Sequence, residues 1–245
     1  MEEVLIKAIT SMNRKYYKLV GKRMIDSFQK NFDIPLYVYW EGDDPPPEAQ
    51  CIDLLKETNL TAFKERNRSK PQDGFFKAAS KFAPKSYSVI HALENSQSDY
   101  TMWLDADVFV HTKIDQSFYD KVITDKMATV LGRKNRYLES GFVVYNHSHP
   151  RLQEFIDIYK ACYEEDKIFD LPEWHDAFVV DWIIKKMDAR ILNLTPHGEN
   201  YQHVFVDSFL GDYMDHMKGK RKTEGSSRRN DMKTRKSQSD YWKGK

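Results

Sequence analysis

Alternating blocks of apolar and polar positions divide the first part of the chain into short strands and amphipathic helices. The apolar run 4–10 predicts a strand, and the helical spacing of apolar residues over 16–31 predicts a helix after it. The β-branched and aromatic run 34–40 predicts a buried strand. Residues 48–58 again have helical spacing. This β-α-β-α order is typical of a parallel sheet with helices on its faces.

The same pattern continues over most of the remaining chain, without an internal repeat. Residues 64–75 are polar and contain a proline and a glycine, so we expect a loop there. After Gly219 apolar residues become scarce, and we expect no packed core, although Tyr241 and Trp242 could dock on the body. We expect helices over 75–96 (interrupted near Pro84), 116–124, 150–163 and 176–187, and strands over 100–110, 127–133, 139–146 and 189–194.

Charge is distributed unevenly along the 245 residues, which are enough for one domain with a substantial core. Residues 218–245 hold 11 Lys and Arg against 3 Asp and Glu, a charge of +8, which leaves the rest at −7. We predict one domain over residues 1–222 and a basic tail over 223–245, whose composition suits a flexible segment.

The basic tail leaves a non-enzymatic function open. Its cations could bind an anion or nucleic acid, and Tyr241 and Trp242 could stack on bases. The acidic body and the absence of a recognised nucleic-acid module disfavour nucleic acid as a partner. An anionic membrane surface, an acidic acceptor or a plain solubilising role are the other interpretations of this segment.

Cysteine use and hydropathy favour a cytoplasmic protein. Cys51 and Cys162 lie far apart and in no metal-ligand spacing, which excludes a disulfide framework and a zinc ribbon. No apolar run approaches the ~18 residues that span a bilayer, so we expect no transmembrane segment. The N-terminus has acids where a signal peptide would have basic residues.

Two carboxylates, Asp105 and Asp107, interrupt an otherwise apolar stretch from Trp103 to Val110. Residues i and i+2 of a strand point to the same side, so these carboxylates would repel each other unless a cation neutralised them. Oxygen ligands favour Mg²⁺, Mn²⁺ or Ca²⁺, and such a cation can hold a diphosphate. The alternative is that the strand ends at Leu104 and that both acids are solvated loop residues.

Two enzyme families carry an Asp-x-Asp motif on a strand. Asp105-Ala106-Asp107-Val108 fits the pattern of haloacid-dehalogenase-like phosphatases, in which Asp105 would be the nucleophile. That motif normally lies on the first strand of its domain, whereas about one hundred residues precede it here. The placement instead resembles glycosyltransferases of the GT-A fold, in layout closest to glycosyltransferase family 8, over about residues 4–222.

This resemblance implies a single Rossmann-like α/β domain of the GT-A type with a mostly parallel central sheet. It also implies a metal-dependent hexosyltransferase that uses Mn²⁺ or Mg²⁺. The donor would be a nucleoside-diphosphate sugar, with UDP favoured because it is common among relatives. The acceptor would be a hydroxyl of a glycan, a lipid-linked molecule or a protein.

Residues of the donor site follow from the resemblance, motif by motif. The end of the first strand would seat the nucleotide base, with Tyr16 after it, and a lysine of the helix before the metal motif would reach the nucleotide. Glu139-Ser140-Gly141 resembles the Asn-Ala-Gly motif that lines the donor sugar, with Glu139 and Ser140 as departures. The expected donor-site residues of these motifs are Thr10, Ser11, Asn13, Tyr16, Lys77 or Lys81, Asp105, Ala106, Ser140 and Gly141.

Two further motifs complete the resemblance. His216, Gly219 and Lys222 fall on a His-x-x-Gly-x-x-Lys spacing in which the histidine is a metal ligand and the lysine binds diphosphate. The implied metal ligands are therefore Asp105, Asp107 and His216, and Lys218, Gly219 and Lys222 would bind the diphosphate.

His175-Asp176 stands where the family has Gln-Asp, so His175 is a departure. Both would contact substrates, although an acid at the start of a helix can simply cap it. An inverting enzyme would need a general base, for which Asp176 is the first candidate and Glu139 the second. A retaining enzyme, as in family 8, would need none.

Overall fold

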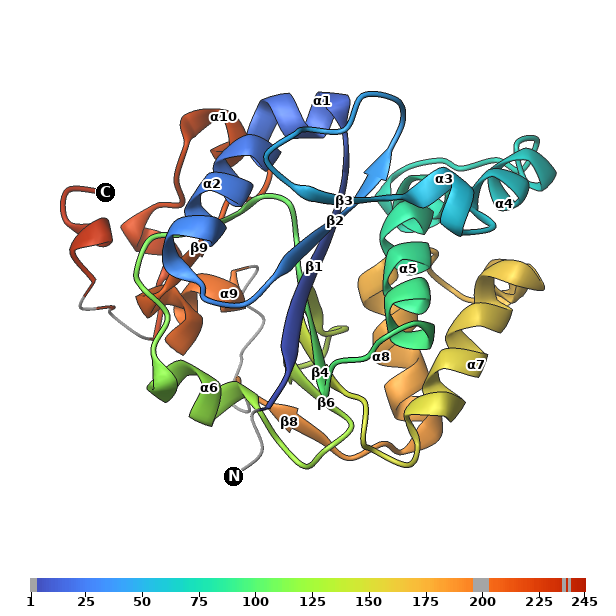
Figure 1. Ribbon diagram of the computed structural model, residues 1–245. Coiled ribbons are helices and arrows are strands. Elements are labelled where there is room, and N and C mark those ends of the chain that lie inside the picture. The colour runs from blue at the N-terminus through green and yellow to red at the C-terminus, as the bar shows by residue number, and fades with distance from the viewer. Residues whose placement is uncertain (1–3, 196–202, 235–236, 238) are drawn as a thin grey trace.

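A seven-stranded sheet forms the centre of the computed structural model, which describes residues 4–195, 203–234, 237 and 239–245 (Figure 1). The strand order is β3-β2-β1-β4-β7-β6-β8, and β7 is antiparallel to both of its neighbours while all other pairs are parallel. The expected α/β domain with a mostly parallel sheet is therefore confirmed. The strands of this sheet are β1 (Ile6–Asn13), β2 (Leu36–Glu41), β3 (Gln50–Asp53), β4 (Tyr100–Leu104), β6 (Ala128–Leu131), β7 (Glu139–Asn146) and β8 (Ile191–Asn193).

Helices cover both faces of this sheet, so the described residues form two cores. Successive strand residues point to opposite faces. In β4, Trp103 belongs to the core beneath α5, α7 and α8, and Met102 to the core beneath α2, α6 and α9 (Figure 1). The α-helices are α1 (Arg14–Tyr16), α2 (Lys22–Asn31), α3 (Leu54–Glu57), α4 (Leu60–Arg66), α5 (Ala79–Glu94), α6 (Gln116–Val122), α7 (Leu152–Glu164), α8 (Asp176–Met187), α9 (Val204–Asp207) and α10 (Arg221–Glu224).

Several expected elements have different boundaries or a different type. The helix expected over 75–96 begins only at Ala79, and Pro84 lies inside it without interrupting it. Residues 48–58 begin with the short edge strand β3 rather than with a helix, because Gln50–Asp53 pairs with β2. The expected loop 64–75 starts inside α4. The first strand, expected over 4–10, continues as β1 as far as Asn13, whose side chain caps the following helix by accepting from Tyr16 N–H.

The chain leaves the main sheet at the Asp-x-Asp motif. The single strand expected over 100–110 is wrong: β4 ends at Leu104, and β5 (Val108–Val110) pairs antiparallel with β9 (Met214–His216) in a separate two-stranded sheet. No element was expected after residue 194, and α9, β9 and α10 follow there. Short 3₁₀ and π segments complete the set at η1 (Tyr17–Gly21), η2 (Phe75–Lys77), η3 (Lys167–Asp170), η4 (Phe209–Asp212), η5 (Arg229–Asp231) and η6 (Asp240–Trp242).

The described part of the C-terminal segment folds back onto the body beside α2 and β9 (Figure 1). Trp242 is buried and donates its indole N–H to Gly211 O at 2.7 Å, while the Tyr241 hydroxyl donates to Asp215 at 2.8 Å. The expectation that this region has no packed core therefore does not hold for these residues, and neither ring is free to stack on bases. Arg235 and Lys236, two of the basic residues of the segment, lie outside the described residues.

Hydropathy gives no sign of a membrane-spanning segment in the described residues, since none of their helices combines the necessary length with sufficient apolar character.

Candidate functional site

A cavity of about 590 Å³ opens where β1, β2 and β4 end and β7 begins. In open α/β sheets, ligands bind beyond the carboxyl ends of the strands. The cavity gathers residues from β1, α5, β7, α8 and β9 as well as from the Asp-x-Asp turn. The predicted residues that line it are Ser11, Asn13, Tyr16, Lys81, Asp105, Ala106, Asp107, Glu139, Ser140, His175, Asp176, His216, Lys218, Gly219 and Lys222.

The Asp-x-Asp motif is a tight turn between β4 and β5, fixed by backbone hydrogen bonds on both sides. Asp105 N–H donates to Gly141 O at 3.0 Å, and Val108 N–H closes the turn on Asp105 O at 3.0 Å. Met217 N–H donates to Asp107 O at 3.0 Å. The alternative interpretation of the sequence was therefore right that the strand ends at Leu104, but the acids are not solvated. Only 7% of the Asp107 side chain and 27% of the Asp105 side chain are exposed.

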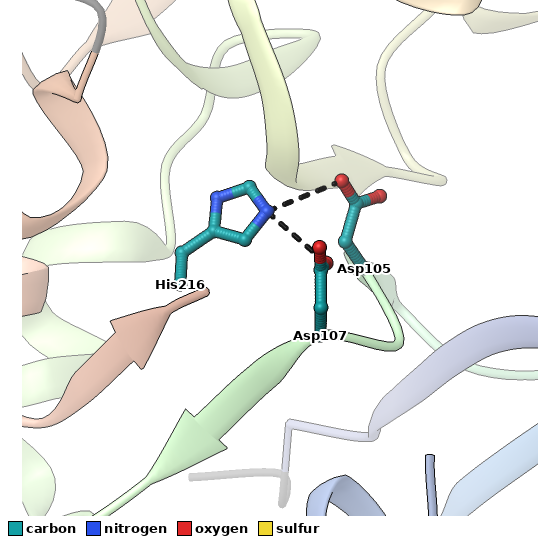
Figure 2. A group of neighbouring side chains, drawn as sticks. All are labelled: Asp105, Asp107 and His216. Carbon is teal, nitrogen blue, oxygen red and sulfur yellow. Dashed lines mark ion pairs between the residues drawn. The ribbon is translucent and has the colours of Figure 1, made fainter. Parts of the chain in front are cut away.

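His216 joins the two aspartates because β9 pairs with β5, which places it opposite Val108. Its Nε2 lies 3.2 Å from Asp107 Oδ1 and 3.5 Å from Asp105 Oδ2 (Figure 2). One ligand atom of each residue lies within 4.8 Å of the others. Two carboxylates and an imidazole form a donor set that suits a divalent cation such as Mn²⁺ or Mg²⁺. These three residues therefore fit the group expected from the sequence and could hold one divalent cation.

Gly141 lets the His216 ring lie against the start of β7. A Cβ at this position would be 2.5 Å from His216 Cε1 and 2.9 Å from Nδ1, closer than real Cβ atoms approach. The resemblance placed this glycine in the motif that lines the donor sugar. In the structure the neighbour that needs the space is the imidazole, and Gly141 does not itself line the cavity.

Electrostatic pairing overcomes the cost of burying these charges. Burial disfavours the charged form of His216, but the carboxylates of Asp107 and Asp105 outweigh it and raise the pKa of His216 to about 9. Burial also opposes ionisation of Asp105, yet Lys85 and His216 hold its pKa well below the ordinary value. A cation that binds Nε2 would displace the imidazole proton, so its affinity depends on pH.

Lys85 is the site residue that the sequence analysis missed. Its Nζ lies 2.7 Å from Asp105 Oδ1, 2.8 Å from Asp176 Oδ2 and 2.8 Å from Ser140 O. The sequence analysis predicted that a lysine of this helix reaches the site, but it named Lys77 or Lys81. Lys77, Lys81 and Lys85 follow one another at intervals of four residues, which is helical spacing. Lys81 lies at the rim, and Lys77 turns away to the Trp174 ring.

Basic residues from the segment after β9 form one wall of the cavity. Lys222 Nζ lies 2.6 Å from Asp107 Oδ2 and also bonds the Tyr16 hydroxyl. Lys218 pairs with Glu139, which burial alone would keep neutral, but the cations around Glu139 lower its pKa to about 2. Gly219 has φ +57°, a left-handed conformation that suits glycine and turns the chain between these lysines.

The sequence left helix capping and substrate contact open for His175 and Asp176, and the structure gives the capping to His175. His175 is the N-cap of α8, since its Nδ1 accepts from Phe178 N–H at 3.3 Å, and its Nε2 lies 2.7 Å from Glu173. Asp176 is therefore released from capping, and its Oδ2 accepts from Ser140 Oγ at 2.5 Å as well as from Lys85. Of the other predicted residues, Thr10 is fully buried in β1 and does not line the cavity.

Comparisons with known proteins define the fold. No protein-family model and no curated protein matches the sequence. Among solved structures, mouse xyloside xylosyltransferase 1 is similar with a TM-score of 0.52 and 11% identity, over 78% of this chain and 85% of that one. A glycosyltransferase involved in the glycosylation of the major capsid of PBCV-1 has a TM-score of 0.50 and 12% identity, over 90% of this chain and 98% of that one.

The bifunctional glycosyltransferase WbbM is also similar, with a TM-score of 0.49 and 11% identity over 78% of this chain, which spans only 39% of that one. The comparison with the mouse and PBCV-1 structures, together with the sheet and the placement of the Asp-x-Asp turn, shows that the chain has the GT-A fold.

Proposed function

We propose that this protein is a metal-dependent glycosyltransferase that moves a sugar from a nucleoside-diphosphate sugar, with UDP as the favoured nucleotide, to an acceptor hydroxyl. The observation that carries the proposal is the Asp105, Asp107 and His216 group at the carboxyl end of β4, on the floor of a cavity of substrate size. The names of the similar mouse and PBCV-1 proteins support the same class of reaction.

The proposed donor site runs from the end of β1 to the start of β7. Ser11, Asn13 and Tyr16 line the side where the nucleotide would lie, and Ser140 lies on the side of the sugar. Asp105, Asp107 and His216 would hold Mn²⁺ or Mg²⁺, and a cation there supplies Lewis-acid stabilisation of the diphosphate as it leaves. Lys222, Lys218 and the backbone at Gly219 would bind the diphosphate oxygens and offset the charge that develops on them.

Asp176 is the residue that we assign to the acceptor hydroxyl, whereas Glu139 pairs with Lys218 on the side proposed for the diphosphate. Asp176 Oδ2 accepts hydrogen bonds from Lys85 and Ser140. These contacts orient the carboxylate and leave Oδ1 as the oxygen outside them. In an inverting reaction Asp176 Oδ1 would accept the proton of the acceptor hydroxyl. In a retaining reaction Asp176 would position substrate instead. The anomeric configuration of the first product, read by NMR, separates the two mechanisms.

The phosphatase alternative has less support from the geometry. An aspartate nucleophile needs a free oxygen that faces the phosphorus atom. Asp105 Oδ1 instead accepts from Lys85 and from the Trp103 indole N–H at 2.8 Å, and Oδ2 faces His216. A stable aspartyl-phosphate analogue at Asp105 would revive this alternative.

Thermal unfolding of the purified chain tests the proposed function directly. We expect one nucleotide sugar to raise the midpoint in the presence of Mn²⁺ or Mg²⁺ but not with a chelator, because a ligand of the native state stabilises it by mass action. Asp107→Ala should abolish this shift. Asp157→Ala, which removes an exposed carboxylate on α7, is the matched control and should retain it. No shift with any nucleotide sugar, or an unchanged shift in Asp107→Ala, would overturn the proposal.

A further inference from the structure

Phe75 is an exposed aromatic ring that lines the cavity, and the exposed Phe76 lies beside it without lining the cavity. Phe75 and Phe76 form η2 and are 50% and 48% exposed. The Phe75 ring centroid lies 5.0 Å from that of Phe82 and 5.1 Å from that of His175. Exposed aromatic rings beside a cavity are typical of ligand sites, since their flat faces pack against apolar ligand surfaces. The apolar face of a sugar ring is one such surface.

The segment η2 is held in place rather than extended into solvent. Trp174 N–H donates to Phe76 O at 2.7 Å, which ties η2 to the segment before α8. Ser80 N–H donates to Gln72 Oε1 at 2.7 Å, and Gln72 Nε2 donates back to Ser80 Oγ at 2.7 Å. A site that is already ordered before binding loses less conformational entropy when a ligand arrives.

A second cavity of about 650 Å³ adjoins the first and shares Phe75 and Lys81 with it. Its walls include three cations. Lys64 is neutralised by Glu41. Arg68 and Lys81 are exposed and form no ion pair within the described ranges. The second cavity therefore presents two positive charges that form no ion pair in the described residues, and one of them, Lys81, lies with Phe75 on the wall that the two cavities share.

Lys81 is also close to the proposed reaction centre. It lies one turn before Lys85 on α5, about 6 Å along the helix axis. Lys85 contacts both Asp105 and Asp176. A ligand that reaches Asp176 with one hydroxyl can therefore place a group about one sugar ring away against Lys81.

We propose that the acceptor is an anionic saccharide, a sugar that carries a phosphate or a carboxylate. One sugar ring packs on Phe75, and the anionic group binds Arg68 and Lys81. The assignment as acceptor rests on the proposed glycosyltransferase function, whereas the binding site itself does not. The diphosphate of the proposed donor is assigned to Lys218 and Lys222, so the two basic groups would serve different ligands.

Isothermal titration calorimetry with two matched pairs of compounds tests this site. The pairs are 4-nitrophenyl glucuronide with 4-nitrophenyl glucoside, and glucose 6-phosphate with glucose. We expect at least one anionic compound to bind ten-fold or more tightly than its neutral partner, and the pair that does so identifies carboxylate or phosphate. A preference below two-fold in both pairs, or no measurable binding of either anionic compound, overturns the proposal.

Variants locate the charge contacts and the packing contacts separately. Arg68→Gln combined with Lys81→Gln should reduce the preference below two-fold, while Lys18→Gln combined with Lys30→Gln, two exposed lysines outside both cavities, should keep it. Phe75→Ser should weaken the anionic and the neutral compound alike. A preference that survives in the Arg68 and Lys81 variant overturns the proposal.

Titration with UDP and Mn²⁺ distinguishes this inference from the proposed function. If UDP displaces the anionic sugar competitively, Arg68 and Lys81 belong to the donor site and the inference is wrong. If the charge preference is present and depends on Arg68 and Lys81, but no nucleoside diphosphate or nucleotide sugar binds, the proposed function fails and the anionic saccharide site stands.

Discussion

The two-stranded β5–β9 sheet carries a histidine at each end, and the two rings have opposite electrostatic states. His216 ends β9 between two carboxylates, which raise its pKa to about 9 against the effect of burial. His111 follows β5 at the other end, where Tyr241 stacks on it at 4.2 Å between ring centroids. There burial, assisted by the charge of Lys245, lowers the pKa of His111 to about 4.

Burial acts in the same direction at both ends, so the neighbouring charges decide the outcome. At the His216 end, acidic and basic side chains neutralise one another, and a divalent cation can replace some of these partners. At the His111 end burial keeps the ring neutral, and its stack with Tyr241 packs the C-terminal segment against the body. One end is therefore suited to exchange cations, and the other holds the structure together.

Replacing Lys85 with methionine should cause the largest loss of stability at the His216 end of the sheet. The variant leaves Asp105 and Asp176 without their shared cation, and removal of one partner from a buried ion pair costs about 3–5 kcal/mol. Urea unfolding without metal should show this loss, and Mn²⁺ should restore more stability to the variant than to the wild type. Lys81→Met, one turn away and without an ion pair in the described residues, should cost less than about 1 kcal/mol. Equal losses in both variants would contradict the assignment.

Trp242→Ala should destabilise the packing of the C-terminal segment at the His111 end of the sheet. Truncation of a buried tryptophan costs about 3–5 kcal/mol, and the variant also loses the hydrogen bond to Gly211 O. Urea unfolding should show the loss, and limited proteolysis should cut the C-terminal segment faster. Metal affinity should change little, because Trp242 does not line the cavity. If the variant has wild-type stability and its C-terminal segment resists proteolysis, the burial of the Trp242 ring does not stabilise the fold.

Gly141→Ala should affect the metal end alone. The added methyl group would overlap the His216 ring and shift Nε2 away from Asp107. We expect Mn²⁺ affinity, measured by titration, to fall about 10- to 100-fold, the range seen when groups that orient metal ligands are lost. Gly132→Ala, where the added atom meets Asn193, is a control with a similar steric conflict outside the metal group. Unchanged Mn²⁺ affinity in Gly141→Ala would contradict the role given to His216.

Lowering the pH should reduce the stability of the folded chain through protonation of His111 in the unfolded chain. The pKa of His111 is about 4 in the folded chain and about 6.5 when unfolded. The unfolded chain therefore binds more protons between these values, so stability is full above pH 6.5 and falls as the pH drops towards 4. This group should remove up to about 2 kcal/mol between pH 7 and pH 5. His111→Phe keeps the stack without the titration, so its stability should fall less over this interval, and equal slopes would contradict the assignment.

Parts of the fold with strong patterns were predictable from the sequence. The bounds of β7 match the prediction, because its apolar centre, Phe-Val-Val-Tyr, favours a strand. The helix α8 also begins and ends as expected. By contrast, β3 is a short, half-polar edge strand whose existence depends on pairing with β2, which no local pattern encodes.

The candidate site was partly predictable, for a related reason. Asp105, Asp107 and His216 were chosen from a motif and a spacing, and the structure brings them together. Lys85 could not be separated from Lys81, because both lie on the same side of α5 and only the position of the helix against β4 decides which one reaches the aspartates. The packing of the described residues from 203 onwards depends on contacts with distant elements rather than on their own sequence.

The pairing of β5 with β9 joins segments that are more than one hundred residues apart in the chain. Contacts of such high sequence separation form late, because the intervening chain must first be ordered. We therefore expect the β5–β9 contact to form after α6, β6, β7, α7 and α8. A cation bound across Asp107 and His216 would hold the two strands together, and if their contact forms after the folding barrier, the cation would slow unfolding without speeding folding. The group proposed for chemistry would then also set the lifetime of the folded protein.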